Sequence, residues 1–177
     1  MRDPVQVWDR AQRTLHWGLA AAVAATWCVG EERLAVHIAA GYAAASIAAA
    51  RVAWGWCGSR HARFASFVHG PRVVFGYARR LAQGRAPRYL GHNPLGGWMV
   101  VALLLCLAIA CTSGILYTTD RFWGVGWLEQ THRISAWTLL ALAGLHVAGV
   151  ALMSWRHRDN LIGAMFTGRK QARGSTD

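Results

Sequence analysis

Four histidines lie within hydrophobic stretches of a chain that otherwise keeps its ionisable groups outside them. They are His16, His37, His132 and His146. Polar groups at membrane depth are costly, so they normally face the interior of a helix bundle and serve a ligand, a proton path or a cofactor. Imidazole is a common axial ligand of haem iron. The number and spacing of these four side chains predict two haems.

The depths of the histidines predict how they pair. His132 and His146 are 14 residues apart, which is close to four helical turns and about 21 Å along one helix face. Because successive spans run in opposite directions, His16 and His146 both lie towards the cytoplasmic side of the membrane. His37 and His132 both lie towards the outer side. Two imidazoles on opposite sides of an iron leave no open position, which favours electron transfer. The predicted axial pairs are His16 with His146 and His37 with His132.

The haem type and its further protein contacts follow from other residues. The chain has four cysteines but no Cys-x-x-Cys-His sequence, the signature of covalent haem attachment. The predicted cofactors are therefore two non-covalent haem b groups. Arg13 lies one turn before His16, and Arg51 lies at the inner end of the second hydrophobic stretch. Either guanidinium could pair with propionates of the inner haem, or could instead reach lipid phosphates.

The hydrophobic residues, 54% of the 177, occur in blocks rather than at amphipathic spacing. A block of about 18 or more apolar residues is long enough to span a bilayer as a helix. Tryptophans and tyrosines lie near the block ends, as in interfacial aromatic belts. These patterns predict an all-α membrane protein whose single domain, residues 1–177, is a four-helix transmembrane bundle. We expect its spans at about residues 14–30, 34–55, 95–117 and 128–153.

The net charge of +11 does not require a nucleic-acid partner, because the basic residues segregate by loop. All but Arg33, Arg121 and Arg133 lie before the first span, at the inner end of the second span or in the connection after it, or after the fourth span. Cytoplasmic loops carry an excess of lysine and arginine. This distribution places both termini in the cytoplasm, together with the loop at about residues 56–94 and the polar tail 156–177.

Three short segments outside the spans carry local signals. Residues 71–82 place apolar side chains opposite arginines, as in a helix lying at the membrane interface. The alternative is a solvated basic loop. Asp3 followed by Pro4 is typical of a helix cap and first turn, which would start the first helix well before its span. We expect the basic stretch 168–174 to fray.

Several segments, taken together, carry a family resemblance. They are Leu15-His16-Trp17; His37 with Gly41, then Arg51 and Trp54-Gly55; Gly58-Ser59-Arg60 through Ala62-Arg63-Phe64; Gly91-His92-Asn93-Pro94-Leu95-Gly96-Gly97; His132 and His146; and Asn160-Leu161 through Thr167-Gly168-Arg169-Lys170. With them the chain resembles the bacterial cytochrome b561 family, which includes the b-type cytochrome subunits of nickel-iron hydrogenases. The resemblance implies a four-helix membrane bundle with two b haems, bound by the same four histidines, that moves electrons between quinone and a partner. Hydrogenase subunits of this family typically have a fifth membrane helix, whereas we expect four spans here, which argues against a dedicated hydrogenase role.

Three functions are compatible with these residues. The first is an electron carrier of the bacterial inner membrane, which links a periplasmic c-type cytochrome or dehydrogenase to the quinone pool. The second is a superoxide:quinone oxidoreductase, in which Arg33, Arg121 and Arg133 would guide the anion. Those arginines are offset by acidic residues on the same side, namely Glu31, Glu32, Asp120 and Glu129. The third is a haem-free membrane scaffold, in which the histidines would be packing groups.

Overall fold

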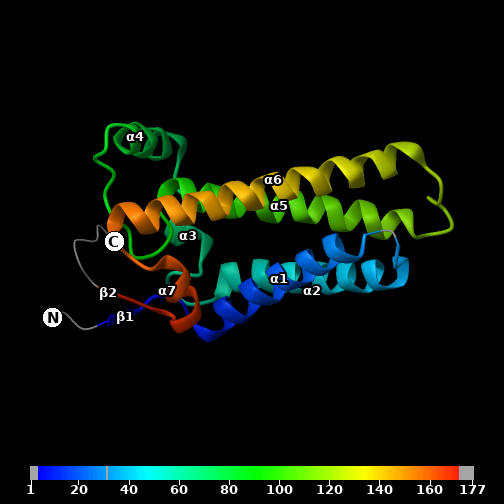
Figure 1. The fold of residues 1–177 in the computed structure, drawn as a ribbon, viewed down its shortest axis with the longest axis horizontal. Helices are drawn as coiled ribbons and strands as arrows, with labels where there is room; N and C mark the ends of the chain where they lie inside the picture. Colours follow the sequence, from blue (N-terminus) through cyan, green and yellow to red (C-terminus); the bar gives the residue numbers. More distant parts are fainter. Residues whose placement is uncertain (1–3, 31, 172–177) are drawn as a thin grey trace. The chain divides into compact units, whose positions relative to one another are not determined.

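The computed structural model describes residues 4–30 and 32–171, most of which are helical (Figure 1). In chain order the elements are β1 (Pro4–Gln6), α1 (Arg10–Val29), α2 (Leu34–Cys57), α3 (Phe64–Phe67), α4 (Pro71–Ala82), α5 (Pro94–Tyr117), α6 (Gly126–His157), α7 (Leu161–Thr167) and β2 (Arg169–Gln171). The prediction of a mainly helical chain is confirmed. The pair of short strands was not expected from the sequence.

Among the described residues, three helices are long and apolar enough to cross a membrane, and these are α2, α5 and α6. Many of their large apolar side chains are exposed, including Leu105 and Leu145, as is expected of helices that face lipid. α1 is a continuous helix of 20 residues but does not meet the same criterion. Arg10, Gln12 and Arg13 occupy its first turn and shorten its apolar part. A fourth span in α1 therefore stays a prediction.

The chain forms two compact units. Unit 1 combines residues 1–13, 53–101 and 144–177, and unit 2 combines residues 14–52 and 102–143. The long helices contribute residues to both units. Of the four predicted histidine ligands, three lie in unit 2, whereas His146 lies in unit 1.

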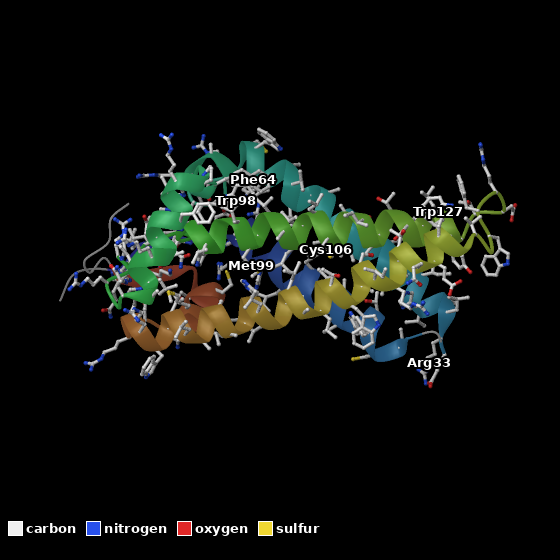
Figure 2. The ribbon with its side chains drawn as sticks, turned by 90° about the horizontal axis from the view of Figure 1, so that it is seen from above. Arg33, Phe64, Trp98, Met99, Cys106 and Trp127 are labelled. Atoms are coloured by element: carbon white, nitrogen blue, oxygen red, sulfur yellow. The ribbon has the colours of Figure 1, made fainter. Side chains whose placement is uncertain are left out.

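The buried core of unit 2 consists of Cys106 and Leu107 of α5 and Leu139 of α6. The partly buried Leu19 and Val23 of α1 and Ala48 of α2 pack against it. Cys106, labelled on α5 in Figure 2, donates a hydrogen bond from Sγ to the carbonyl oxygen of Ser135 on α6 at 3.2 Å. At Gly18, an added Cβ would be 3.5 Å from Ile47. Small residues thus let neighbouring helices approach closely, as is common in membrane proteins.

Both ends of the described chain meet in unit 1. β1 pairs antiparallel with β2, with Val5 opposite Lys170. The expectation that a helix starts near Asp3 and Pro4 is wrong at Pro4, which begins a strand; Asp3 lies outside the described residues. The expectation of fraying is wrong for Arg169–Gln171, because these residues form β2. Residues 172–174 lie outside the described part of the chain. No local pattern in the sequence predicts that β1 and β2 pair, because the two strands are far apart in the chain.

Asp9 fixes the start of α1. Its carboxylate accepts hydrogen bonds from the backbone amide of Gln12 at 2.7 Å, from Nε1 of Trp54 at 3.1 Å, and from Oγ of Ser59. Burial alone would raise the pKa of Asp9, but the hydrogen bonds from Ser59, Gln12 and Trp54 together lower it below its ordinary value. The charged carboxylate therefore joins the first turn of α1 to the segment that follows α2.

α4 has the bounds predicted for the amphipathic segment 71–82. Its Tyr77 side chain is fully buried, whereas Phe75 is 75% exposed. Arg79 and Arg80 occupy its last turn, where positive charge interacts favourably with the helix dipole. The predicted helix is confirmed, and its position at a membrane surface stays a prediction.

Candidate functional site

His37 of α2 and His132 of α6 face each other within unit 2. Their ring centres are 6.1 Å apart, and the ring planes are inclined at 79°. The two residues are separated by 95 positions in the sequence, so the contact depends on how α2 and α6 pack. The structure thus brings together the two histidines that depth alone had paired.

Backbone carbonyls of neighbouring helices hold both rings. Nδ1 of His37 lies 3.1 Å from the carbonyl oxygen of Thr26 on α1. Nδ1 of His132 lies 2.9 Å from the carbonyl oxygen of Ala110 on α5. When Nδ1 carries the proton and donates it to the carbonyl, Nε2 keeps its lone pair for a metal. The sequence could not predict the roles of Thr26 and Ala110, because every residue has a backbone carbonyl and the residue type therefore does not indicate which one accepts a hydrogen bond.

Gly114 of α5 lies against the His132 ring. An added Cβ there would lie 2.9 Å from Cε1 of His132 and 3.0 Å from Nδ1, so a larger residue would force the ring to move. Ser135 donates from Oγ to the carbonyl oxygen of His132 at 2.9 Å. At Gly41, one turn beyond His37, an added Cβ would meet nothing within 4 Å. The sequence gave no signal for Gly114, because this residue lies on a different helix from either histidine.

The histidine pair fits the axial ligand set of a haem iron. A metal–imidazole bond is about 2 Å long, so two imidazoles on opposite sides of one iron place their ring centres about 6 Å apart. Rings that share such an axis can have any angle between their planes. No group of three or more His, Cys, Asp or Glu side chains that could hold a metal ion occurs in residues 4–30 and 32–171. A haem iron needs only two ligands from the protein.

The other two predicted ligands lie in different units. His16, in unit 2, packs against Trp17 with ring centres 5.1 Å apart. His146, in unit 1, is half-buried on α6. The pairing of His16 with His146 therefore stays a prediction.

The two predicted propionate partners have distinct surroundings. Arg13 donates from Nη1 to the carbonyl oxygen of Phe166 and from Nε to that of Asp9, and so links the start of α1 to the end of α7. Arg51 is only 4% exposed near the end of α2. A role in binding propionates stays a prediction for both.

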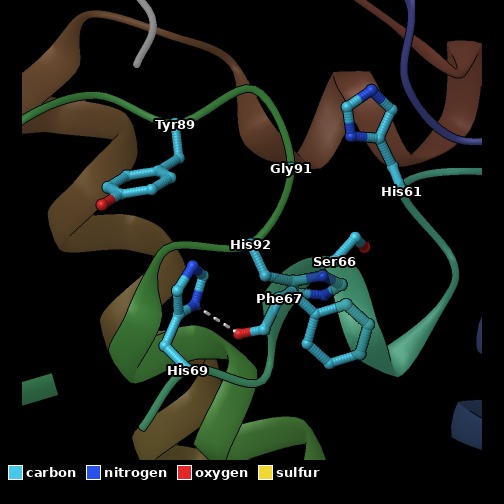
Figure 3. Close-up of a pocket in the computed structure, with 7 residues that line it drawn as sticks. All are labelled: His61, Ser66, Phe67, His69, Tyr89, Gly91 and His92. Carbon is cyan, nitrogen blue, oxygen red and sulfur yellow. Dashed lines mark hydrogen bonds between the residues drawn. The ribbon is translucent and has the colours of Figure 1, made fainter. Parts of the chain in front are cut away.

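Sequence reasoning also missed a cavity of about 200 Å³ in unit 1. It is lined by His61, Ser66, Phe67, His69, Tyr89, Gly91 and His92 (Figure 3). In the sequence these histidines carry no ligand signal, because they lie outside the hydrophobic stretches. Three histidines interspersed with aromatic residues between residues 61 and 92 were the available signal.

The fold and the site define a class of protein: a helical membrane protein with facing imidazoles suited to a redox cofactor. A family model for prokaryotic cytochrome b561 matches residues 7–168. The chain therefore belongs to the prokaryotic cytochrome b561 family, and the family prediction is confirmed. Membership implies haem b binding and electron transfer in a membrane. No curated protein and no solved structure matched the chain.

Proposed function

We propose that this chain is a di-haem b-type cytochrome of the bacterial inner membrane. It carries electrons between a periplasmic redox partner, such as a c-type cytochrome or a dehydrogenase, and the quinone pool. The observation that carries the proposal is the His37–His132 pair, with ring centres 6.1 Å apart and both Nδ1 atoms within hydrogen-bond distance of backbone carbonyls. A bound haem supplies a centre that accepts and releases one electron at a time.

The four histidines divide into two axial pairs in this proposal. His37 and His132 hold the outer haem, and His16 and His146 hold the inner one. Two imidazoles leave no iron position for substrate, so the protein moves electrons instead of activating a ligand at the metal. The carbonyl oxygens of Thr26 and Ala110 orient the outer pair and favour the tautomer that leaves each Nε2 for the iron.

The proposed topology has four spans, with α1 as the first and both termini in the cytoplasm. Support for the fourth span comes from unit 2, where Leu19 and Val23 of α1 pack into the same core as residues of α2, α5 and α6. Support for the orientation comes from the excess of basic residues in the connections that would face the cytoplasm. Arg13 and Arg51 are the proposed partners of the inner haem propionates.

The described residues give no specific support to a superoxide:quinone oxidoreductase. Arg33, Arg121 and Arg133 are exposed, but so are Glu32, Asp120 and Glu129. This mixture of charges lacks the single-sign potential that would concentrate an anion. Reduction of the purified protein by a c-type cytochrome, but not by a superoxide-generating system, would separate the two functions.

Haem stoichiometry tests the proposal. We expect the purified protein to be coloured and to contain two haems per chain by pyridine haemochrome quantitation. Both haems should be extractable by acidic acetone, since neither is covalently attached. A short-chain quinol should reduce the haems and give a b-type spectrum. A colourless protein, a single haem per chain, or haem that resists extraction would contradict the proposal.

A further inference from the structure

The cavity in unit 1 has the chemistry of a site for a flat ring with hydrogen-bonding oxygens. Imidazole, phenol and hydroxyl groups line it, and each can both donate and accept hydrogen bonds. Phe67 and Tyr89 add aromatic faces. No carboxylate is among its lining residues. Ligand sites of this kind combine aromatic walls with a few convergent polar groups.

Several lining side chains are held in place by neighbours. His69 has Nδ1 2.8 Å from the carbonyl oxygen of Phe67, as the dashed line in Figure 3 shows. When Nδ1 donates this bond, Nε2 remains an acceptor. The His92 ring packs between Phe67, at 4.6 Å, and Trp8, at 4.8 Å between ring centres. The cavity walls are therefore preorganised, which reduces the entropic cost of binding.

A chain of aromatic contacts leads from the cavity to the helix of His146. The ring centres of Tyr89 and Tyr77 are 5.8 Å apart. The buried Tyr77 hydroxyl donates to Sδ of Met153 on α6 at 3.7 Å. Met153 follows His146 by seven residues, or about two helical turns and ~10 Å along the axis. All of these residues lie within unit 1, so the contacts connect the cavity to a predicted haem ligand.

Apolar side chains beside the cavity offer a route for a hydrophobic tail. Val68, between two lining residues, is 37% exposed. Trp98, at the start of α5, is 45% exposed and donates from Nε1 to the carbonyl oxygen of His69 at 2.8 Å. Figure 2 labels Trp98 on this part of α5. In the proposed topology, this end of α5 lies at the inner membrane surface.

We propose that this cavity binds the head group of the quinone. The ring lies against the aromatic walls, a carbonyl oxygen accepts a hydrogen bond from the Tyr89 hydroxyl, and the isoprenoid tail leaves past Val68 and Trp98. This inference rests on the proposed function and adds the location of the quinone site.

Photoaffinity labelling with a short-chain azidobenzoquinone tests the site on the haem-loaded protein. We expect mass spectrometry to place the label on peptides within residues 61–92. Ser66→Trp fills the cavity from its rim, because Ser66 is exposed and uses its hydroxyl only within its own helical turn, donating to the Arg63 carbonyl at 2.6 Å. This variant should keep both haems and lose at least 90% of the label.

Thr119→Trp is the matched control. Thr119 is also exposed and donates to the carbonyl oxygen three residues earlier, at 2.6 Å, but it belongs to neither the cavity nor unit 1. Its labelling should equal that of the unchanged protein. Tyr89→Phe, which removes one hydroxyl from the lining, should raise the Kd of the quinone about 3- to 10-fold.

The outcomes separate the quinone site from the proposed function. If quinol reduces the haems but the label falls outside residues 61–92, or survives Ser66→Trp, the location is wrong and the proposed function stands. If the haem-loaded protein takes up no label, the location is wrong as well. If the protein binds no haem, the proposed function fails, whatever the labelling shows.

Discussion

The histidines of the two units differ in what their rings contact. In unit 2, His37 and His132 face each other, and each has Nδ1 beside a backbone carbonyl of an adjacent helix. In unit 1, His92 is held by ring packing against Trp8 and Phe67 and borders a cavity. A carbonyl beside Nδ1 favours one tautomer of an imidazole, as it also does for His69 of unit 1, but only in unit 2 do two rings held in this way form a close pair. The first arrangement suits a metal ligand, and the second suits a binding wall.

The two units also differ in what holds them together. Unit 2 has a core of small and aliphatic residues on long helices. Unit 1 combines a small apolar cluster of Val7, Trp8, Leu90 and Ala164 with polar contacts between short segments, such as those of Asp9 and the ion pair of Arg88 with Asp159 at 2.8 Å. We therefore expect changes of charge to affect unit 1 more than unit 2.

The largest effect should follow from Gly114→Leu. A side chain here displaces the His132 ring, because even a Cβ would lie 2.9 Å from Cε1. We expect the haem content to fall from two per chain to one, measured by pyridine haemochrome. Gly144→Leu is the control, since an added Cβ at Gly144 meets nothing within 4 Å. Two haems in the Gly114 variant would show that the ring position does not matter for binding.

Gly97→Ala should destabilise unit 1 by about 2 kcal/mol. An added Cβ would lie 2.3 Å from the carbonyl oxygen of Phe67, and the backbone there must move to admit it. The adjacent Gly96→Ala brings its Cβ to 3.4 Å from Oδ1 of Asn93, and should be neutral or stabilising by up to about 1 kcal/mol. Thermal unfolding in detergent micelles measures both. Equal melting temperatures would contradict the close packing at Gly97.

Asp9→Ala should cost about 2 kcal/mol, because it removes a helix cap and leaves the donors of Trp54 and Ser59 without their acceptor. Hydrogen exchange of the amides in residues 4–13 measures the loss. Asp9→Asn, which keeps the size of the side chain and some acceptor capacity, should lose less. Unchanged exchange in the alanine variant would mean that the network contributes nothing.

Asp9 should also make this region sensitive to acid. Its pKa is lowered in the folded protein, so it stabilises the fold fully above its ordinary value of 3.8. The stabilisation is lost as the pH falls through the lowered pKa, because the protonated group is a weaker acceptor. Exchange at residues 4–13 should therefore rise more steeply below this pH in the unchanged protein than in Asp9→Asn. Parallel pH profiles would assign the acid sensitivity to other groups.

The smallest effect should follow from Arg88→Lys. Arg88 uses Nη2 for both the carboxylate of Asp159 and the carbonyl oxygen of Gln171, each at 2.8 Å. Lysine keeps the charge but lacks the planar guanidinium, so we expect a loss of about 1 kcal/mol in the free energy of unfolding. Added salt should change this difference little, because both side chains are mostly buried. A strong salt dependence would indicate an exposed pair.

The sequence predicted those features that depend on local composition. Apolar blocks located α2, α5 and α6, and amphipathic spacing located α4. Depth along the helices was sufficient to pair His37 with His132, because helical rise converts sequence position into depth. The sequence was less informative about α1. This segment forms a helix, but its polar first turn shortens the apolar part, and α1 is not among the helices long and apolar enough to cross a membrane.

Features that depend on long-range contacts were not predicted. Asp9 meets Trp54 and Ser59, which are 45 and 50 residues away. β1 and β2 come from opposite ends of the described chain. The cavity walls come from separate parts of one irregular connection. In each case the sequence shows the residues, but no periodic pattern predicts that they meet. The contacts depend on how distant segments fold against one another.

The most direct measurement is low-temperature electron paramagnetic resonance of the ferric protein with His37→Met and, separately, His132→Met. Methionine replaces one imidazole by a thioether and raises the reduction potential of the haem that it ligates. If His37 and His132 bind one iron, both substitutions alter the signal of the same haem and leave the other signal unchanged. Changes in two different haems, or in neither, would show that the two histidines do not share an iron.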